Sequence, residues 1–573
     1  MAPFAPSMDR PSLVSLDQRH ASTLAAFVPE SAPEQKLSGW SKPDLDGIER
    51  ALHAWARERA DAPRTHFNVR DSALSSVEDR VLEDLAGLIA LSRELPLAAR
   101  DPDVLHRPLA CLTVEASSLT KGDADAAARL ADRVQSLPAH LEATRGAVRR
   151  APIALIDAAR ATARHAPALL NALLTRTHES VGEVATGKLR SAIDDLRPAL
   201  AAHDRFLDGL PVDESIPVAI GKDALDALLK ARRVDLDSTE VKELARTYIE
   251  VARLEQARVR RRGFRSRSLE QASVLARTQT PFSLEEAAAW TQELVDQARA
   301  FLHETTAYPT RGQETLLVEE GSTAHGSVFG PVSYLRAAGA GPARLVLSDA
   351  DDEIGLARFS VSDLEAHTAR LAYPGHHLSC TIARRGDDPI RGGLLQDGAL
   401  PSTSLYALDR VEGWAAFSES TMRELHFRDS PSVRLVTIQR LLTSSLLAWY
   451  DVALARGECS LDDAVAQLSA HAAMPLQVAR RHIVRLARAP SSGLSALVGR
   501  VRLDQLRRAA HTSWRHAYSE RRFNELVLLS GHVPVSLLFS LLEAFSPFNL
   551  DEGTQEYELG ERPGEKKDTT SEG

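Results

Sequence analysis

The amino-acid sequence carries apolar residues at helical spacing over most of its length. Between residues 124 and 146, four of them recur on a single helical face: Leu130, Val134, Leu137 and Leu141. This spacing predicts an amphipathic helix. Because such a helix has one apolar face that a neighbour must cover, the predicted helices are expected to pack against one another.

Two polar pairs indicate where further helices begin. Asp237 with Glu240, and Ser283 with Glu286, have the separation of a helix N-cap and the side chain that completes a capping box. Apolar residues at helical spacing follow both pairs. We therefore expect helices to start directly after Asp237 and after Ser283.

The periodicity changes once, in the middle of the chain. Residues 314–322 (ETLLVEEGS) and 343–349 (ARLVLSD) predict two short strands that flank a glycine-rich loop, GSVFGPVSYLRAAGAGP. The loop lacks the third glycine and the following helix of a dinucleotide site. The acidic run DADDE (349–353) has no calcium-loop spacing and is expected to be a solvated turn. The predicted fold class is mainly α, a large multi-helix domain with a small β insertion.

These patterns divide the chain into five predicted segments. Residues 1–40, rich in Pro and Ser, are expected to be partly disordered, and the acidic tail 551–573 to be disordered. Between them we expect an N-terminal helical half over 41–310, the β insertion over 311–360, and a C-terminal helical half over 361–550 that carries the candidate site.

Composition narrows the class of protein. The 573 residues are 44% hydrophobic and 26% charged, with a formal net charge of -9, which predicts a soluble chain without an overall field that attracts nucleic acid. The arginine run over 258–268 is expected to be a solvated helix end. Three dispersed cysteines suit a reducing cytoplasm, and no apolar segment approaches the length of a membrane span. We expect a cytoplasmic protein without nucleic-acid or membrane partners; oligomeric state stays open.

Candidate chemistry lies in the stretch LAYPGHHLSC, where His376 and His377 follow a Pro-Gly pair. Ser362 and Glu365 upstream have capping-box spacing, so a helix is predicted from about Asp363 to the residue before the proline. Cys380, close behind the histidines, is expected to be a small buried side chain.

A second segment, VEGWAAFSES, places Glu412 and Glu419 two helical turns apart around Trp414. Histidines on one helix and a glutamate on another are the donors that hold zinc in helical metallopeptidases, where the cation activates water.

At these motifs the sequence resembles a known family. AYPGHHLS and EGWAAFSE are similar to the HExxPGHHLQ and EGWALYAE signatures of the bacterial group called domain of unknown function 885, and three further phrases over 235–256, 489–499 and 523–538 follow in the family's order. The resemblance implies a helical, zinc-peptidase-like domain covering roughly residues 70 to 545.

The departures from the family pattern bear on catalysis. Arg370 and Leu371 occupy the positions of the family's His-Glu pair, which the resemblance assigns to a zinc ligand and the general base. Further family polar residues are replaced at four positions: Ala455, Ala496, Leu497 and Asn524. Together these changes indicate a degenerate metal site.

Several residues remain candidates for the site. His376, His377 and Glu412 can supply three metal ligands, with His367 as a relocated ligand, although His367 on an apolar face is expected to be a hydrogen-bonded core residue. The cofactor is then zinc or none. We expect Arg370 to pair with Glu412 or Glu419 in a pocket shared with Tyr373 and Trp414.

Two functions follow from this reading. The first is a non-catalytic or repurposed binding protein for a peptide, a small molecule or a protein partner. The alternative is a metal-dependent amide or peptide hydrolase with a rebuilt site, in which Glu419, Glu365 or Asp451 acts as the base. The sequence does not decide whether the protein is an enzyme.

Overall fold

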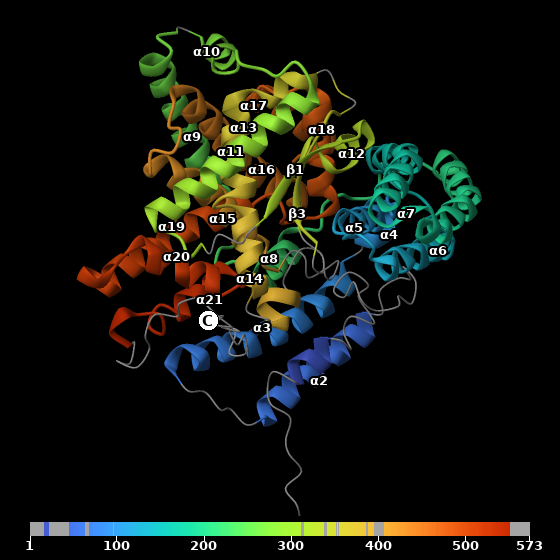
Figure 1. Ribbon diagram of the computed structural model, residues 1–573, viewed down its shortest axis with the longest axis horizontal. Helices are drawn as coiled ribbons and strands as arrows, with labels where there is room; N and C mark the ends of the chain where they lie inside the picture. The colour runs from blue at the N-terminus through green and yellow to red at the C-terminus, as the bar shows by residue number, and fades with distance from the viewer. Residues whose placement is uncertain are drawn as a thin grey trace, which may run out of the picture.

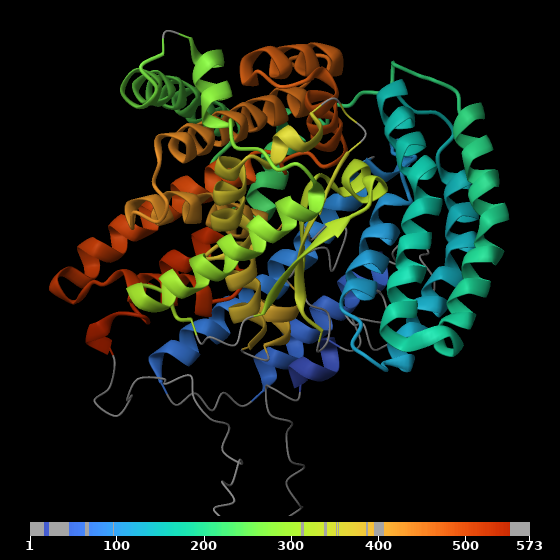
Figure 2. The ribbon, with the colours of Figure 1, turned by 45° about the horizontal axis from the view of Figure 1, so that its top comes forward.

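The computed structural model describes residues 16–21, 45–62, 68–95, 97–266, 268–310, 315–336, 341–350, 352, 354–385, 388–394 and 406–549. The predicted disordered tail 551–573 and most of the predicted disordered segment 1–40 lie outside these residues. The described chain is mainly helical with one small sheet (Figures 1 and 2). The predicted fold class is confirmed. The boundaries of the five predicted segments stay predictions.

The N-terminal helices form two groups. They are α2 (Leu45–Asp61), α3 (Val69–Glu94), α4 (Leu97–Arg100), α5 (His106–Ser117), α6 (Ala124–Ala147) and α7 (Ile153–Gly209). In both views α6 and α7 stand to one side of the molecule, and α2 and α3 lie beneath the C-terminal helices. The four residues that predicted α6 are all buried. α7 is interrupted at Gly182, where a φ of 80° breaks the helix into two segments.

Two of the next four helices begin where the capping pairs predict. They are α8 (Lys222–Ala231), α9 (Ser238–Gly263), α10 (Leu269–Ala276) and α11 (Leu284–Thr305). Asp237 and Glu240 form a capping box at the start of α9, and the Ser283 side chain caps α11. Both predictions are confirmed. Arg260, Arg261 and Arg262 of the arginine run lie in the last turn of α9, where positive charge interacts favourably with the helix dipole.

The sheet has three strands in the order β1-β3-β2. β1 (Leu316–Gly321) and β3 (Ala343–Ser348) are the two strands that the sequence predicts; they pair in parallel, and α12 (Thr323–Phe329) follows β1. The third strand, β2 (Val332–Leu335), pairs antiparallel with β3 and lies in the segment interpreted as a glycine-rich loop. β2 was missed because it has only four residues between a proline and the glycine-rich sequence AAGAGP. It forms one edge of the sheet.

The C-terminal helices enclose the core. They are α13 (Val361–His367), α14 (His376–Arg385), α15 (Leu408–Glu424), α16 (Pro431–Arg456), α17 (Leu461–Ala472), α18 (Leu476–Arg488), α19 (Ser495–Trp514), α20 (Glu520–Leu529) and α21 (Val535–Ser540). The largest apolar cluster joins Trp55 of α2 to Trp414 of α15 and Trp514 of α19, so both ends of the chain share one core. Within the described part of the chain, no helix has the length and apolar character to cross a membrane.

Helices α15 and α19 cross at two glycines. A Cβ atom added to Gly499 would lie 1.8 Å from the carbonyl oxygen of Asp409, and one added to Gly413 would lie 2.4 Å from the carbonyl carbon of Gly499. The two backbones therefore pack at a separation that a side chain would prevent. This contact holds α15, and with it the glutamates of the candidate site, against the core.

We expect Gly499→Ala to destabilise the protein by about 1–3 kcal/mol, because the methyl group forces these backbones apart. Gly187→Ala is the matched control: Gly187 is helical and exposed, and nothing lies within 4 Å of its added Cβ, so this change should be neutral or slightly stabilising. Thermal unfolding followed by circular dichroism checks both. Equal midpoints for the two variants would contradict the close crossing.

Candidate functional site

A compact turn places the two motif histidines. α13 begins at Val361 with Ser360 as its N-cap, so the predicted cap at Ser362 is wrong. The Ser362 hydroxyl instead donates to the carbonyl of Ala276 at 2.7 Å, because a tertiary contact competes with local capping. α13 ends at His367, and a π turn over Thr368–Ala372 leads into the Pro-Gly pair.

Gly375 is required by a close backbone approach. A Cβ atom there would lie 1.7 Å from the carbonyl oxygen of Arg370. Trp414 of α15 is fully buried, and its indole Nε1 donates to the carbonyl of Pro374 at 2.8 Å. The turn is therefore fixed between its own preceding residues and α15. This arrangement brings the Arg370 side chain to the two glutamates of α15.

The guanidinium of Arg370 contacts both glutamates. It donates to Glu412 Oε2 at 2.7 Å and to Glu419 Oε1 at 3.5 Å. Arg440 of α16 donates to the same oxygen of Glu419 at 3.4 Å. The expected pairing of Arg370 with the glutamates is thus present with both of them, and Glu419 is shared by two guanidinium groups.

The electrostatics of this cluster favour the ionised form of Glu412. Burial alone would raise the pKa of Glu412, but the charges of His376, Arg370 and Arg485 outweigh it and hold that pKa below its ordinary value. The carboxylates in turn raise the pKa of Arg370 against the effect of burial. The cluster therefore carries fixed positive and negative charges at neutral pH.

The two adjacent histidines both lie against the ring of Tyr334 but have different polar neighbours. His376 Nε2 lies 3.7 Å from Glu412 Oε1, and the Tyr334 ring stacks against the His376 ring. His377 Nδ1 lies 3.4 Å from the hydroxyl of Tyr334, and its ring meets the edge of Tyr373 with centroids 5.2 Å apart. Over the residues that the structure describes, no group of three His, Cys, Asp or Glu side chains is arranged to hold a metal ion.

This donor set does not fit the zinc site that the family motif implies. The guanidinium of Arg370 lies between the glutamates, where a dication would be repelled. Leu371, at the position of the family's general base, packs on the apolar core instead. The arginines of the cluster can bind and orient anionic groups. The leucine side chain at residue 371 has no polar group that could take a proton from water.

The remaining candidates near this cluster are Glu365, His367 and Cys380. Glu365 is buried and accepts from Arg428 at 2.9 Å. The buried Nδ1 of His367 has no protein hydrogen-bond partner, so the hydrogen bond expected of a core histidine is not present at that nitrogen. Burial and the charges of Arg440 and Arg370 hold the pKa of His367 well below its ordinary value. Cys380 is buried as expected.

Asp451 has a structural environment. Its carboxylate accepts backbone N–H groups from Ser491 at 2.9 Å, Gly493 at 2.8 Å and Leu494 at 3.2 Å. Burial raises its pKa to about 7, although these N–H groups and Arg232 act in the opposite direction. The carboxylate closes the turn between α18 and α19.

A large cleft opens beside the motif cluster. Its volume is about 2090 Å³, and its walls come from α5, α7, α12, β2, the segment around Arg358, α16 and α18. We call it the arginine cleft. Five of its lining arginines matter most below: Arg336, Arg358, Arg440, Arg481 and Arg485. Tyr334 and Arg440 belong both to the cleft wall and to the motif cluster. The cluster therefore lies directly behind that wall.

Sequence reasoning missed this cleft. Its walls lie far apart in the chain, and the one available signal was local: α18, LQVARRHIVRLAR, combines a strongly apolar face with arginines at helical spacing. The expectation of a solvated turn is wrong for Asp352 of the acidic run, because its side chain is 1% exposed and pairs with both Arg358 and Arg481.

Comparison with known proteins agrees with this architecture. The model of a family described as bacterial protein of unknown function (DUF885) matches residues 17–542. The chain is thus a mainly helical domain, and it belongs to this family. No curated protein matches it.

Two solved structures share the fold, each described as a "putative lipoprotein". The one from Colwellia psychrerythraea has a TM-score of 0.72 at 15% identity, covering 93% of this chain and 98% of the other. The one from Shewanella oneidensis, of unknown function, has a TM-score of 0.67 at 14% identity, covering 93% and 100%. At these identities the likeness shows the fold alone.

We expect Asp451→Asn to gain stability relative to the wild type as pH rises from 5 to 8. Because the folded-state pKa of Asp451 is raised to about 7, its contribution to stability is complete below the unfolded-state pKa near 4 and is lost as pH rises through 7. The asparagine variant cannot ionise, so it escapes this loss.

Thermal midpoints of both proteins across that range check the sign. Asp462→Asn is the control, because the Asp462 side chain is 84% exposed. A midpoint difference between Asp451→Asn and wild type that stays constant with pH would show that Asp451 does not titrate in this range.

Proposed function

We propose that this chain is a non-catalytic member of its family and that it binds a peptide, a small molecule or a protein partner in the inherited cleft. The observation that carries the proposal is the Arg370 guanidinium between Glu412 and Glu419. A guanidinium cannot polarise a carbonyl or deliver hydroxide as a metal ion does. It satisfies the two carboxylates without an ion.

The remaining acidic candidates support the same proposal. A general base must be within hydrogen-bond reach of the attacking water. Glu365 is engaged by Arg428, Glu419 by two arginines, and Asp451 by three backbone N–H groups. Each of these carboxylates already accepts hydrogen bonds from the protein itself.

A metal-dependent amide or peptide hydrolase with a rebuilt site is the second candidate. The observation in its favour is the approach of His376 to Glu412, at 3.7 Å, which are two of the three side chains that such a site requires. In this function the His377 ring would have to turn away from Tyr334 and Tyr373, and Arg370 would have to leave the glutamates.

Elemental analysis of the untagged, full-length protein distinguishes the two. We expect zinc well below one ion per chain, and no change in thermal midpoint or in amide hydrolysis when a chelator is added. The double variant Arg370→His, Leu371→Glu serves as a positive control, because it supplies a ligand and a base and is expected to bind zinc. Stoichiometric zinc in the wild type, with hydrolysis that chelation abolishes, would refute the non-catalytic function.

A further inference from the structure

The lining of the arginine cleft carries an excess of positive charge. Eleven arginines and six carboxylates line it, although the whole chain has a net charge of -9. The carboxylates are largely engaged: Arg488 holds Asp101 at 2.7 Å and Asp103 at 2.9 Å, and Arg277 holds Asp363 at 2.7 Å. They do not neutralise the remaining guanidinium groups.

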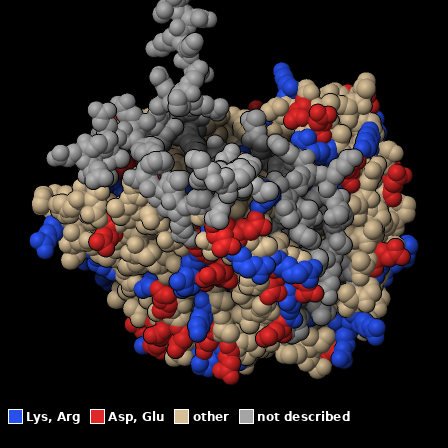
Figure 3. All heavy atoms as spheres, turned by 90° about the horizontal axis from the view of Figure 1, so that it is seen from below, with Lys and Arg blue, Asp and Glu red and all other residues tan. Residues whose placement is uncertain are grey.

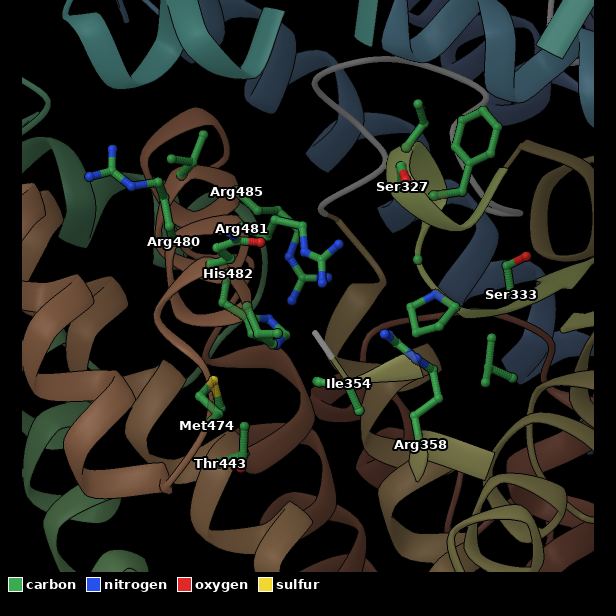
Figure 4. Close-up of a pocket in the computed structure, with 18 of the residues that line it drawn as sticks. Ser327, Ser333, Ile354, Arg358, Thr443, Met474, Arg480, Arg481, His482 and Arg485 are labelled. Atoms are coloured by element: carbon green, nitrogen blue, oxygen red, sulfur yellow. The ribbon is translucent and has the colours of Figure 1, made fainter. Parts of the chain in front are cut away.

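The surplus charge is concentrated on facing walls. Arg481 and Arg485 extend from α18, and Arg358 extends from the opposite wall toward the same space, whereas Arg480 of α18 points away (Figure 4). Arg358 and Arg481 share the single carboxylate of Asp352. In the described part of the chain Arg485 has no ion pair, and its side chain is exposed to the cleft.

A neighbouring histidine responds to this charge. His482 lines the same cleft, and burial together with the charges of Arg485 and Arg481 lowers its pKa to about 3. The imidazole therefore stays neutral at physiological pH and adds a hydrogen-bonding group without adding charge. The outer surface differs: on the face in Figure 3, acidic and basic side chains are interspersed wherever described residues are visible.

The dimensions of the cleft suit an extended peptide. A volume of about 2090 Å³ exceeds the roughly 300–1,000 Å³ typical of small-molecule sites. Arg481 and Arg485 are four residues apart on a helix, a rise of about 6 Å, and alternate side chains of an extended chain are separated by about 6.6 Å. Two acidic side chains at positions i and i+2 therefore match the two arginines. β2, an edge strand, forms part of the facing wall.

We propose that the arginine cleft binds an extended peptide with acidic side chains at alternate positions, held by Arg481 and Arg485 on one side and Arg358 on the other. This inference rests on the proposed binding function and specifies its ligand. Carboxylates pair with guanidinium groups through charge-assisted hydrogen bonds. Apolar lining residues such as Phe329 and Met474 contact the side chains between the acidic ones.

The test measures fluorescence anisotropy of a labelled peptide of about ten residues with glutamate at alternate positions, and of its glutamine counterpart. Full-length wild type is used with a chelator present, so that any metal-dependent cleavage is suppressed. We expect the glutamate peptide to bind at least about tenfold more tightly than the glutamine peptide. Its affinity should fall as salt is raised.

Arg485→Gln is the principal variant, since its arginine has no ion pair among the described residues and its loss should leave the fold intact. It should weaken binding of the glutamate peptide by about tenfold. Arg480→Gln is the control on the same helix: Arg480 is one of the eleven lining arginines, but its side chain points away from Arg481, Arg485 and Arg358 (Figure 4), so its loss should weaken binding much less than the loss of Arg485. Circular dichroism confirms that both variants are folded.

Three results would overturn the inference: absent or equal binding of the two peptides, equal losses for the two variants, or displacement of the peptide by inorganic tripolyphosphate at lower concentration than by unlabelled peptide. The last would identify a phosphate site. Failure here leaves the non-catalytic function standing. Conversely, stoichiometric zinc together with metal-dependent hydrolysis would refute the non-catalytic function. The peptide inference would still hold in that case if the chelated protein bound the glutamate peptide selectively.

Discussion

The contact of one guanidinium with two glutamates organises the centre of this protein. Arg370 lies on the turn between α13 and α14, and Glu412 and Glu419 lie two turns apart on α15. A charge placed in such a semi-buried location must be paired, because an unpaired carboxylate there is costly. The guanidinium meets that requirement with directional hydrogen bonds. The two glutamates are therefore paired within the protein itself, without any further cation.

Shared carboxylates link this cluster to the cleft beside it. Glu419 is shared by Arg370 and Arg440, and Asp352 by Arg358 and Arg481. In the motif cluster the two arginines are balanced by two glutamates, because Arg370 also holds Glu412. At Asp352 two guanidinium groups meet one carboxylate, so the surplus positive charge lies on the cleft side, in a chain of negative net charge.

Local signals made much of the fold predictable. The capping box at Asp237, the cap at Ser283 and the apolar stripe of α6 depend on neighbouring residues in the sequence, and all three are present. The pairing of Arg370 with the glutamates was predictable because the resemblance places these opposite charges in one pocket. The choice of Ser360 over Ser362 as the N-cap of α13 was not predictable from the sequence. Both serines have suitable spacing, and a contact of Ser362 with α10 decides between them.

Tertiary assembly accounts for the rest of what the sequence did not reveal. The arginine cleft joins α18 to a segment more than a hundred residues earlier, and no periodicity reports that juxtaposition. Asp352 belongs to a run of acidic residues that is polar by composition, yet two arginines from different segments bury it. β2 is too short to produce a recognisable alternation. Each case depends on contacts between distant parts of the chain.

The bridge through Asp352 has a consequence for how quickly a ligand is captured. Because this carboxylate is almost fully shielded from solvent, mobile ions screen it weakly, and the separation of the two walls is set when the protein folds. The conformational entropy of Arg358 and Arg481 is then lost before any encounter. A peptide bound as proposed would meet arginines that are already ordered and whose field attracts it. Ionic strength should therefore affect the association rate more than the lifetime of the complex.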